Sequence, residues 1–258
     1  MEDNIILEMK GITKEFPGVK ALDNVDLTLR RGRVCALMGE NGAGKSTLMK
    51  ILIGVYTPTS GVIKFKGEEV RIKNPNEALN KGIAMIHQEL NPIVERSIME
   101  NIWLGREPLK GKLGIIDHKK MYDDTIELLK NLNLDLNPKE KMKNLTVAQM
   151  QMVEIVKAVS YNSEIVIMDE PTSSLTNKEV EHLFKIIEEL KKQGKAIAYI
   201  SHKMDEIFRI SDDITIFRDG KYVGSYESKE MNSEKLINLM VGREIKDLFP
   251  KTNCDIGE

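Results

Sequence analysis

Short apolar runs, each followed by a polar loop, alternate along the chain with longer segments of helical periodicity. Strands that are buried on both faces read as continuous apolar runs, so four such runs predict the central strands of a parallel sheet. Between them, residues 147–159 and 177–193 carry apolar side chains at helical spacing. Strands that alternate with helices predict an α/β fold with a mainly parallel sheet. The four runs are residues 34–38, 83–87, 165–168 and 196–200.

Two further portions have a different pattern. Residues 5–9, 25–30 and 62–65 read as strands near the N-terminus and predict a flanking antiparallel β subdomain. Residues 90–160 are mainly helical in pattern, with an amphipathic stretch over 117–133, and interrupt the strand series as an inserted α-helical subdomain. A hairpin at Asp219-Gly220 and a last helix over residues 233–241 complete the predicted elements.

Residues 39–47, Gly-Glu-Asn-Gly-Ala-Gly-Lys-Ser-Thr, fit the pattern G-x-x-x-x-G-K-[ST]. They stand between a predicted buried strand and a predicted helix, which is the context that a phosphate-binding loop requires. Lys45 can reach the β- and γ-phosphates of a nucleotide, and the Ser46 hydroxyl can bind Mg²⁺. The competing interpretation is a glycine-rich turn that contains Lys-Ser by chance, and the flanking strand and helix argue against it.

Other polar side chains also follow predicted strands, at the edge where α/β sheets bind ligands. Asp169 follows an apolar strand and suits Mg²⁺, and the adjacent Glu170 can accept a proton from an attacking water. Gln88 and His202 end two further strands. Taken singly, an Asp-Glu pair can be a solvated strand end, His202 a structural histidine and Gln88 an ordinary loop residue. Four polar positions at strand ends predict one converged active site, a P-loop nucleotide-binding core.

Composition excludes several classes of protein. The 258 residues carry a formal net charge of −2, which argues against bulk electrostatic binding to nucleic acid.

The two cysteines, Cys35 and Cys254, lie in a predicted buried strand and a polar tail, so we expect no structural disulfide and a reducing, cytoplasmic setting. The acidic start of the chain predicts no signal peptide, and no apolar run reaches the ~20 residues that span a bilayer.

Taken in order, these motifs resemble the ATP-binding cassette family of ATPases, from Phe16 through the Walker A loop and Gln88 to the Walker B strand 165–169, Glu170 and His202. Before that comparison, Phe16 reads equally well as an adenine-stacking ring or as a core residue. The resemblance implies ATP and Mg²⁺ as cofactors, with Lys45, Gln88, Glu170 and His202 as catalytic residues and Ser46, Gln88 and Asp169 around the metal. It also implies that Ser173–Thr176 line the contact with a second cassette. The nucleotide would be held by Phe16, Gly39, Glu40, Asn41, Gly42, Ala43, Gly44, Lys45, Ser46 and Thr47.

The signature motif departs from the common form of the family. Leu-Ser-Gly-Gly-Gln is replaced by Leu145, Thr146, Val147, Ala148 and Gln149, so two glycines become residues with a Cβ atom. We expect this to weaken any contact between the signature and the ATP of a partner cassette.

The same stretch, with Phe16–Leu22 and Met240–Glu244, resembles the N-terminal cassette of the tandem ATP-binding subunits of bacterial ribose and galactose importers. This resemblance implies one nucleotide-binding domain over residues 1–242 and a linker over residues 243–258 toward a second cassette on the same chain. It implies an ATPase at the cytoplasmic face of the membrane, with integral membrane permease subunits as partners and, indirectly, a sugar-binding protein. The alternatives are an importer of another small solute, a soluble cassette ATPase in DNA repair or translation, and a nucleotide-binding regulator without turnover.

Overall fold

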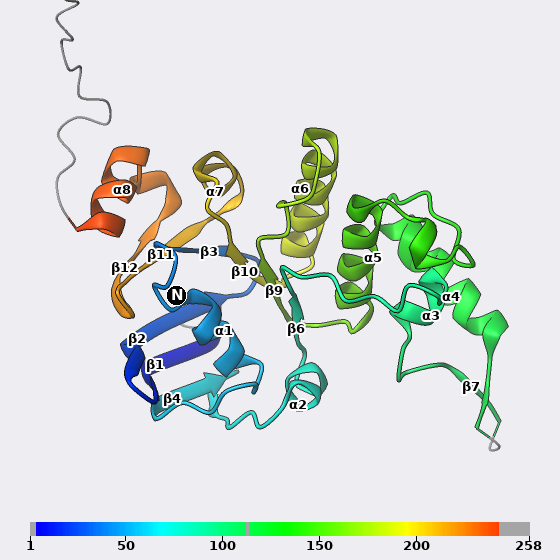
Figure 1. Ribbon diagram of the computed structural model, residues 1–258, viewed down its shortest axis with the longest axis horizontal. Coiled ribbons are helices and arrows are strands. Elements are labelled where there is room, and N and C mark those ends of the chain that lie inside the picture. The colour runs from blue at the N-terminus through cyan, green and yellow to red at the C-terminus, as the bar shows by residue number, and fades with distance from the viewer. Residues whose placement is uncertain (1–3, 112–113, 243–258) are drawn as a thin grey trace, which may run out of the picture.

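The computed structural model describes residues 4–111 and 114–242, and a ten-stranded mixed sheet forms its centre (Figure 1). The strands follow the order β5-β4-β1-β2-β12-β11-β3-β10-β9-β6. Five neighbouring strands pair in parallel, so their carboxyl ends meet at one edge. They are β11 (Asp213–Arg218), β3 (Val34–Met38), β10 (Ala196–Ile200), β9 (Ile165–Asp169) and β6 (Ile83–Ile86).

The other half of the sheet is antiparallel and lies beside this parallel block. β1 pairs with β2 and β4, and β4 pairs with β5. β12 joins the halves, because it pairs antiparallel with β11 and at one position in parallel with β2. These strands are β1 (Ile5–Phe16), β2 (Val19–Arg30), β4 (Ser60–Phe65), β5 (Glu68–Glu69) and β12 (Lys221–Glu227).

Helices cover the sheet and form a group at one end of the molecule (Figure 1). α3 (Ile98–Ile102), α4 (His118–Asn131) and α5 (Val147–Ser160) make up that group, and the small hairpin of β7 (Leu109–Lys110) and β8 (Ile115–Ile116) projects from it. The remaining helices are α1 (Lys45–Leu52), α2 (Pro75–Asn80), α6 (Asn177–Lys192), α7 (Met204–Ile210) and α8 (Ser233–Val241).

The parallel strands are buried along almost their whole length because both of their faces are covered. Alternate residues of β3 illustrate this: Cys35 and Leu37 belong to one core cluster with helix α1 and the antiparallel strands. Val34, Ala36 and Met38 belong to a second cluster with residues of α5 and α6. The continuous apolar runs in the sequence therefore correspond to strands between two cores, as predicted.

The predicted fold class is confirmed, with corrections to single elements. The first strand extends to Phe16 rather than ending at residue 9, because a shift of register at Gly11, whose φ is +62°, lets a polar stretch continue the pairing. The region around residues 90–160 contains the hairpin β7–β8 in addition to helices. The short helices α2 and α7 were not predicted, since six or seven residues carry too little periodicity. The predicted linker over residues 243–258 lies outside the described residues.

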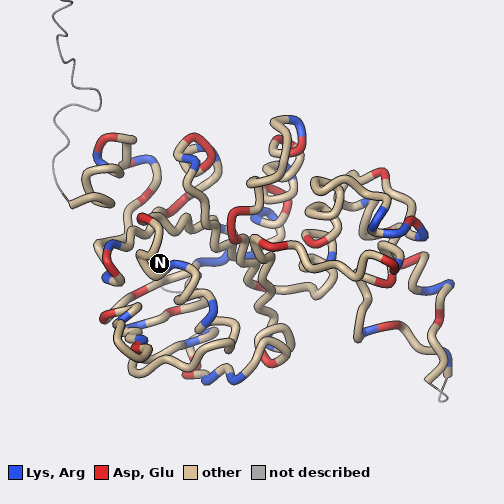
Figure 2. Tube along the Cα trace, viewed as in Figure 1, with Lys and Arg blue, Asp and Glu red and all other residues tan. Residues whose placement is uncertain are grey.

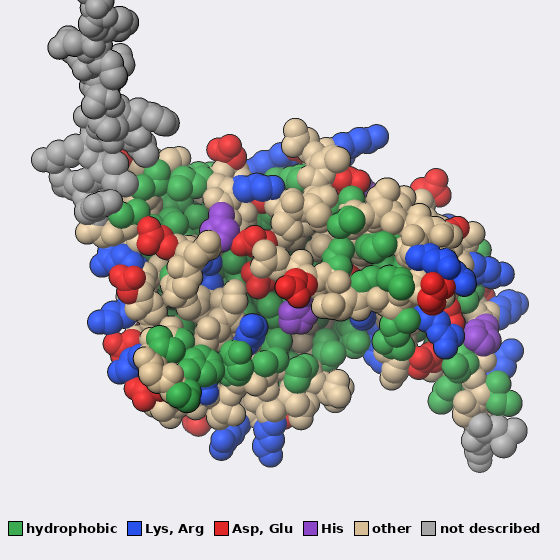
Figure 3. All heavy atoms as spheres, in the orientation of Figure 1, with side chains coloured by type: hydrophobic (Ala, Val, Ile, Leu, Met, Phe, Trp, Pro, Cys, Tyr) green, Lys and Arg blue, Asp and Glu red, His purple; other side chains and the backbone are tan. Residues whose placement is uncertain are grey.

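Charged side chains of both signs are interspersed along the trace and over the face that Figures 2 and 3 show. This distribution agrees with the small net charge, and the face in Figure 3 shows no broad basic patch. Among the helices of the described chain, none is long and apolar enough to span a bilayer.

Candidate nucleotide-binding site

The loop between β3 and α1 can only be built with glycine at two positions. Gly39 has a φ of +153°, and a Cβ atom there would lie 2.3 Å from the carbonyl oxygen of Phe217. Gly44, the residue before α1, has a φ of +97°, and its Cβ would lie 2.5 Å from a methyl carbon of Leu22. A glycine-rich loop that leads into a helix can turn backbone N–H groups toward an anion at the positive end of the helix dipole, so the loop before α1 is a candidate anion-binding site.

Lys45 is the first residue of α1 and is 7% exposed. Its ammonium donates hydrogen bonds to the carbonyl oxygens of Gly39, at 2.6 Å, and Glu40, at 3.0 Å. Burial lowers the pKa of the Lys45 ammonium, and the negative charges of Glu170 and Asp169 partly offset that effect. A desolvated cation is thus held inside the loop, where it can neutralise a bound anion.

The parallel register brings the predicted polar positions together in one cleft. Ile200 of β10 pairs with Asp169 of β9, so the residues that follow these strands are neighbours. Gln88 follows β6 and His202 follows β10. Sequence reasoning missed Ala21 and Ile200, whose apolar side chains give no signal of a site. The cleft is lined by Ala21, Asn41, Gly42, Ala43, Gly44, Lys45, Ser46, Thr47, Gln88, Asp169, Glu170, Ile200 and His202.

Glu170 is the meeting point of the polar groups. Its carboxylate accepts a hydrogen bond from Gln88 Nε2 at 3.2 Å and lies 2.7 Å from His202 Nε2. The backbone of Glu170 has a φ of 47°, a left-handed conformation that non-glycine residues rarely adopt. Its N–H donates to the carbonyl oxygen of Ile200 at 2.9 Å, which holds the strained residue to the next strand. The carboxylate is therefore aimed by backbone geometry as well as by its two side-chain partners.

Asp169 ends β9 and is 8% exposed. Burial raises the pKa of its carboxyl group, and the charge of Glu170 raises it further, while the Ser46 hydroxyl and the nearby cations partly offset both effects. The cleft thus gathers a hydroxyl, two carboxylates and the amide oxygen of Gln88. Hard oxygen donors of this kind fit Mg²⁺, which prefers few protein ligands together with phosphate oxygens.

Phe16 does not line this cleft. It ends β1, and its ring packs edge to face against Tyr56 with 5.1 Å between the ring centroids. The Lys14 ammonium lies 4.9 Å from the centroid of the Phe16 ring and donates to the carbonyl oxygen of Thr57. Tyr56, which the sequence analysis did not single out, follows α1, so this aromatic pair stands just beyond the opposite end of the helix that begins in the phosphate loop.

The signature segment is also absent from the residues that line the cleft. Thr146 and Gln149 form a capping box at the start of α5: the Thr146 hydroxyl accepts from the Gln149 N–H at 3.2 Å, and the Gln149 side chain accepts from the Thr146 N–H at 2.9 Å. Val147 is 55% exposed and Ala148 is 8% exposed. The helix start is therefore intact, and Val147 is an exposed apolar side chain of the signature.

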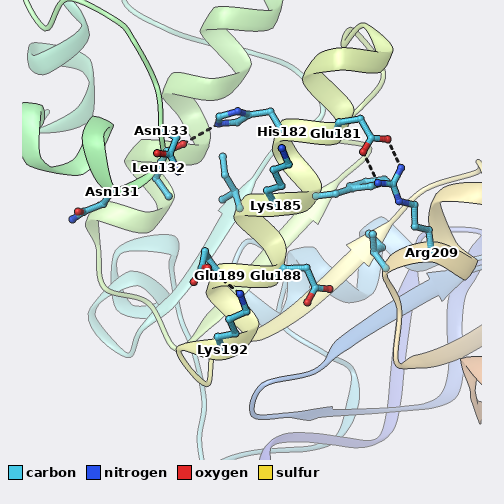
Figure 4. Close-up of a pocket in the computed structure, with 13 residues that line it drawn as sticks. Asn131, Leu132, Asn133, Glu181, His182, Lys185, Glu188, Glu189, Lys192 and Arg209 are labelled. Carbon is cyan, nitrogen blue, oxygen red and sulfur yellow. Dashed lines mark hydrogen bonds and ion pairs between the residues drawn. The ribbon is translucent and has the colours of Figure 1, made fainter.

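A second cavity lies between the end of α4 and helices α6 and α7 (Figure 4). Several of its polar side chains already have partners: Glu181 pairs with Arg209, and His182 Nε2 lies 2.9 Å from the carbonyl oxygen of Leu132. Lys192 is likewise paired with Glu189. Mutual pairing leaves these groups little capacity for a ligand, so the cleft at the phosphate loop is the candidate site.

A phosphate loop followed by α1, with carboxylates and a histidine at neighbouring strand ends, defines a P-loop nucleotide-binding domain. The family model described as ABC transporter matches residues 22–173, so the chain belongs to the ABC transporter family. A solved nucleotide-free ATP-binding cassette from an ABC transporter superposes with a TM-score of 0.79 and 26% sequence identity, covering 92% of this chain and 95% of that one.

Three curated relatives are similar to this chain over nearly its whole length. A galactose/methyl galactoside import ATP-binding protein of Photobacterium profundum is 64% identical over 99% of this chain, which spans 52% of that protein. A protein of the same name from Clostridium perfringens is 59% identical over 95% of this chain, which spans 47% of that protein. A putative ribose/galactose/methyl galactoside import ATP-binding protein of Halalkalibacterium halodurans is 57% identical over the whole chain and is covered to 49%. The chain spans about half the length of these relatives.

Proposed function

We propose that the chain is an ATP-hydrolysing cassette that energises a membrane importer of simple sugars of the ribose and galactose type. The convergence of Lys45, Asp169, Glu170 and His202 on one phosphate loop carries the hydrolytic part of this proposal. The solute is inferred from the relatives named as galactose import ATP-binding proteins, which are 57–64% identical to this chain.

Each polar group in the cleft has a distinct task in this proposal. Backbone N–H groups of residues 39–47 and the Lys45 ammonium hold the phosphates. Ser46, Asp169 and Gln88 hold Mg²⁺, which supplies charge neutralisation at the phosphates when it is bound. Glu170 orients and deprotonates the attacking water, and His202 holds the Glu170 carboxylate and reaches toward the γ-phosphate. Phe16 remains the proposed adenine-stacking residue, although its ring packs against Tyr56 outside the lining of the cleft.

The partners follow from the same proposal. Integral membrane permease subunits supply the transport path, a sugar-binding protein delivers the solute, and the cassette lies at the cytoplasmic face of the membrane. A second cassette pairs with this one, and Leu145–Gln149 of this chain face the ATP that the second cassette holds. Support comes from the relatives, which are about twice as long as this chain. An importer of another small solute is the alternative that shares every feature of the cleft.

The test of the hydrolytic role is Glu170→Gln in the assembled importer. The amide keeps the size of the side chain but cannot accept the proton, so hydrolysis should fall ~10²–10⁴-fold while Mg-ATP binds with near-normal affinity. Glu188→Gln, an exposed position on α6, is the matched control and should turn over normally. Equal turnover in the two variants would refute the role of Glu170.

The solute is tested separately with the importer in vesicles. Radiolabelled galactose and ribose should accumulate only when ATP is present on the cassette side, and a labelled amino acid should not. If the importer still hydrolyses ATP but takes up neither sugar, the proposed solute is wrong and the proposed ATPase activity is not affected.

A further inference from the structure

Glu206, on α7, is a buried carboxylate that the proposed mechanism does not use. It is 8% exposed. One oxygen, Oε2, accepts hydrogen bonds from the hydroxyls of Tyr199 at 2.8 Å, Thr172 at 2.9 Å and Ser201 at 3.2 Å. The other oxygen, Oε1, lies 3.1 Å from the Lys203 ammonium. Three hydroxyl donors and one cation thus converge on a single carboxylate.

These donors belong to the two segments that carry the proposed catalytic groups. Thr172 stands two residues after Glu170, and Ser201 directly precedes His202. The Lys203 ammonium closes the cluster by donating to the carbonyl oxygen of Thr172 at 3.2 Å. The Glu206 carboxylate therefore joins the backbone that follows Glu170 to the backbone on both sides of His202.

His202 depends on such an anchor for its position. Its side chain is 42% exposed, so packing does little to orient the ring. Its imidazole nevertheless lies 2.7 Å from the Glu170 carboxylate. Ser201 accepts a hydrogen bond from the Lys203 N–H at 3.1 Å while it donates to Glu206, which fixes the backbone turn at His202.

A carboxylate is an unfavourable side chain at the buried position of Glu206 unless it has hydrogen-bond partners. Burying a carboxylate is unfavourable unless its oxygens are fully hydrogen-bonded, and an apolar side chain would pack α7 at less cost. Burial raises the pKa of the Tyr199 phenol, and the Glu206 charge raises it further, so Tyr199 remains a hydrogen-bond donor at any ordinary pH. The cluster is satisfied only with the carboxylate in the centre, since a carboxylate alone offers two acceptor oxygens and no donor.

We propose that Glu206 is a positioning residue for ATP hydrolysis, which holds His202 against Glu170 through Ser201 and Thr172. This inference rests on the proposed function, because it assumes that Glu170 and His202 act in hydrolysis. It adds a residue that lies outside the cleft and touches none of the atoms that react.

The primary test is Glu206→Gln, with turnover measured in the assembled importer. Glutamine has one acceptor oxygen, so its NH₂ group must face either the hydroxyls or the Lys203 ammonium. The value of kcat for ATP should fall about ten- to a hundredfold, the cost of misplacing a catalytic group by about 1 Å. The KM for ATP should stay within about twofold, because the phosphate loop lies on other segments. Asp205→Asn removes the same charge from the neighbouring, exposed position of α7 and should leave kcat unchanged.

A double substitution separates positioning from a purely structural role. If Glu206 acts through His202, Glu206→Gln should lower kcat by less than about twofold in a His202→Ala background, whereas independent effects would multiply. Ser201→Ala removes one hydroxyl with little change in volume and should lower kcat severalfold, which keeps the proposal testable if Glu206→Gln does not fold.

These measurements test the role of Glu206 separately from the role of His202. Normal kcat in Glu206→Gln, or the same fold-loss with and without His202, would overturn the role of Glu206 and leave that of His202 standing. Normal kcat in His202→Ala would overturn the proposed role of His202, and with it this inference.

Discussion

The fold gives charged residues of the cleft unusual properties. These are the shifted pKa values of Lys45 and Asp169 and the left-handed backbone of Glu170. Each is charged, and the first two are less than a tenth exposed. The attraction of the Lys45 ammonium to both carboxylates partly offsets its burial, whereas the two carboxylates repel each other. The sequence motif identified these residue types and their order along the chain. It gave no sign of the left-handed backbone at Glu170, a residue that the fold holds to β10 by the hydrogen bond to Ile200.

At this scale we predict that Lys45→Ala loses nucleotide affinity. Charge-assisted hydrogen bonds contribute about 1.5–3 kcal/mol each, so the Kd for ATP should rise about ten- to a hundredfold. Isothermal titration with ATP measures this directly. Lys192→Ala, at the exposed end of α6, is the control. An unchanged Kd in Lys45→Ala would contradict the place of Lys45 in the phosphate site.

The start of α5 illustrates what individual elements contribute. Thr146 is the N-cap of this helix, with reciprocal hydrogen bonds to Gln149. The departure from the common signature therefore preserves the helix start while it changes the surface at Val147. The sequence reveals this because capping depends on residues three positions apart, whereas the short hairpin β7–β8 has no comparable local signal.

We predict that Thr146→Ala destabilises the fold without affecting the phosphate loop. Losing an N-cap costs about 1 kcal/mol, which should appear as a lower midpoint in urea unfolding. Thr146→Ser keeps the hydroxyl and should unfold like the parent. If both variants unfold at the parent midpoint, packing rather than the cap determines where α5 begins.

Over the whole molecule, ion pairs join the antiparallel strands to the parallel block. Glu164, directly before β9, pairs with Arg31 at 2.7 Å and with Lys66. Burial raises the pKa of the Glu164 carboxyl, but the hydrogen bonds from Lys66 and Arg31 lower it by more, so the pKa lies below the ordinary value of 4.5. A carboxyl whose pKa is lowered by folding stabilises the folded state above its unfolded pKa, and this contribution is lost as the pH falls below 4.5.

Glu164→Gln should therefore lower the free energy of unfolding by about 1 kcal/mol at neutral pH. The difference from the parent should shrink as the pH falls through the acid range, where the parent carboxylate is itself protonated. Urea unfolding at a series of pH values tests this, with the exposed Glu68→Gln as control. A difference that stays constant across the series would mean that packing, not charge, explains the effect.

The proposed pairing of two cassettes gives the last prediction at this scale. In that pairing, a cassette of this sequence alone would offer only Thr146, Val147 and Ala148 to the nucleotide of a copy of itself. Each transition-state contact of ~1.4 kcal/mol that is lost costs about tenfold in rate, so its ATPase activity should be low. Adding a second cassette on the same chain should raise the activity, since the site built on Lys45 and Glu170 then faces another signature. Comparable specific activity in both proteins would show that this signature is competent.

By itself the sequence determined the strand and helix types of the core, the phosphate loop, and the polar positions that follow the strands. These features are local: buried strands need apolar runs, and a loop that wraps an anion needs glycine and lysine at fixed spacing. Only the tertiary structure decided that Gln88, Glu170 and His202 touch, because their contact depends on the order and register of β6, β9 and β10. It likewise decided that Glu206 gathers hydroxyls from the segment after β9 and from the end of β10, since these side-chain hydrogen bonds leave no periodic trace in the sequence.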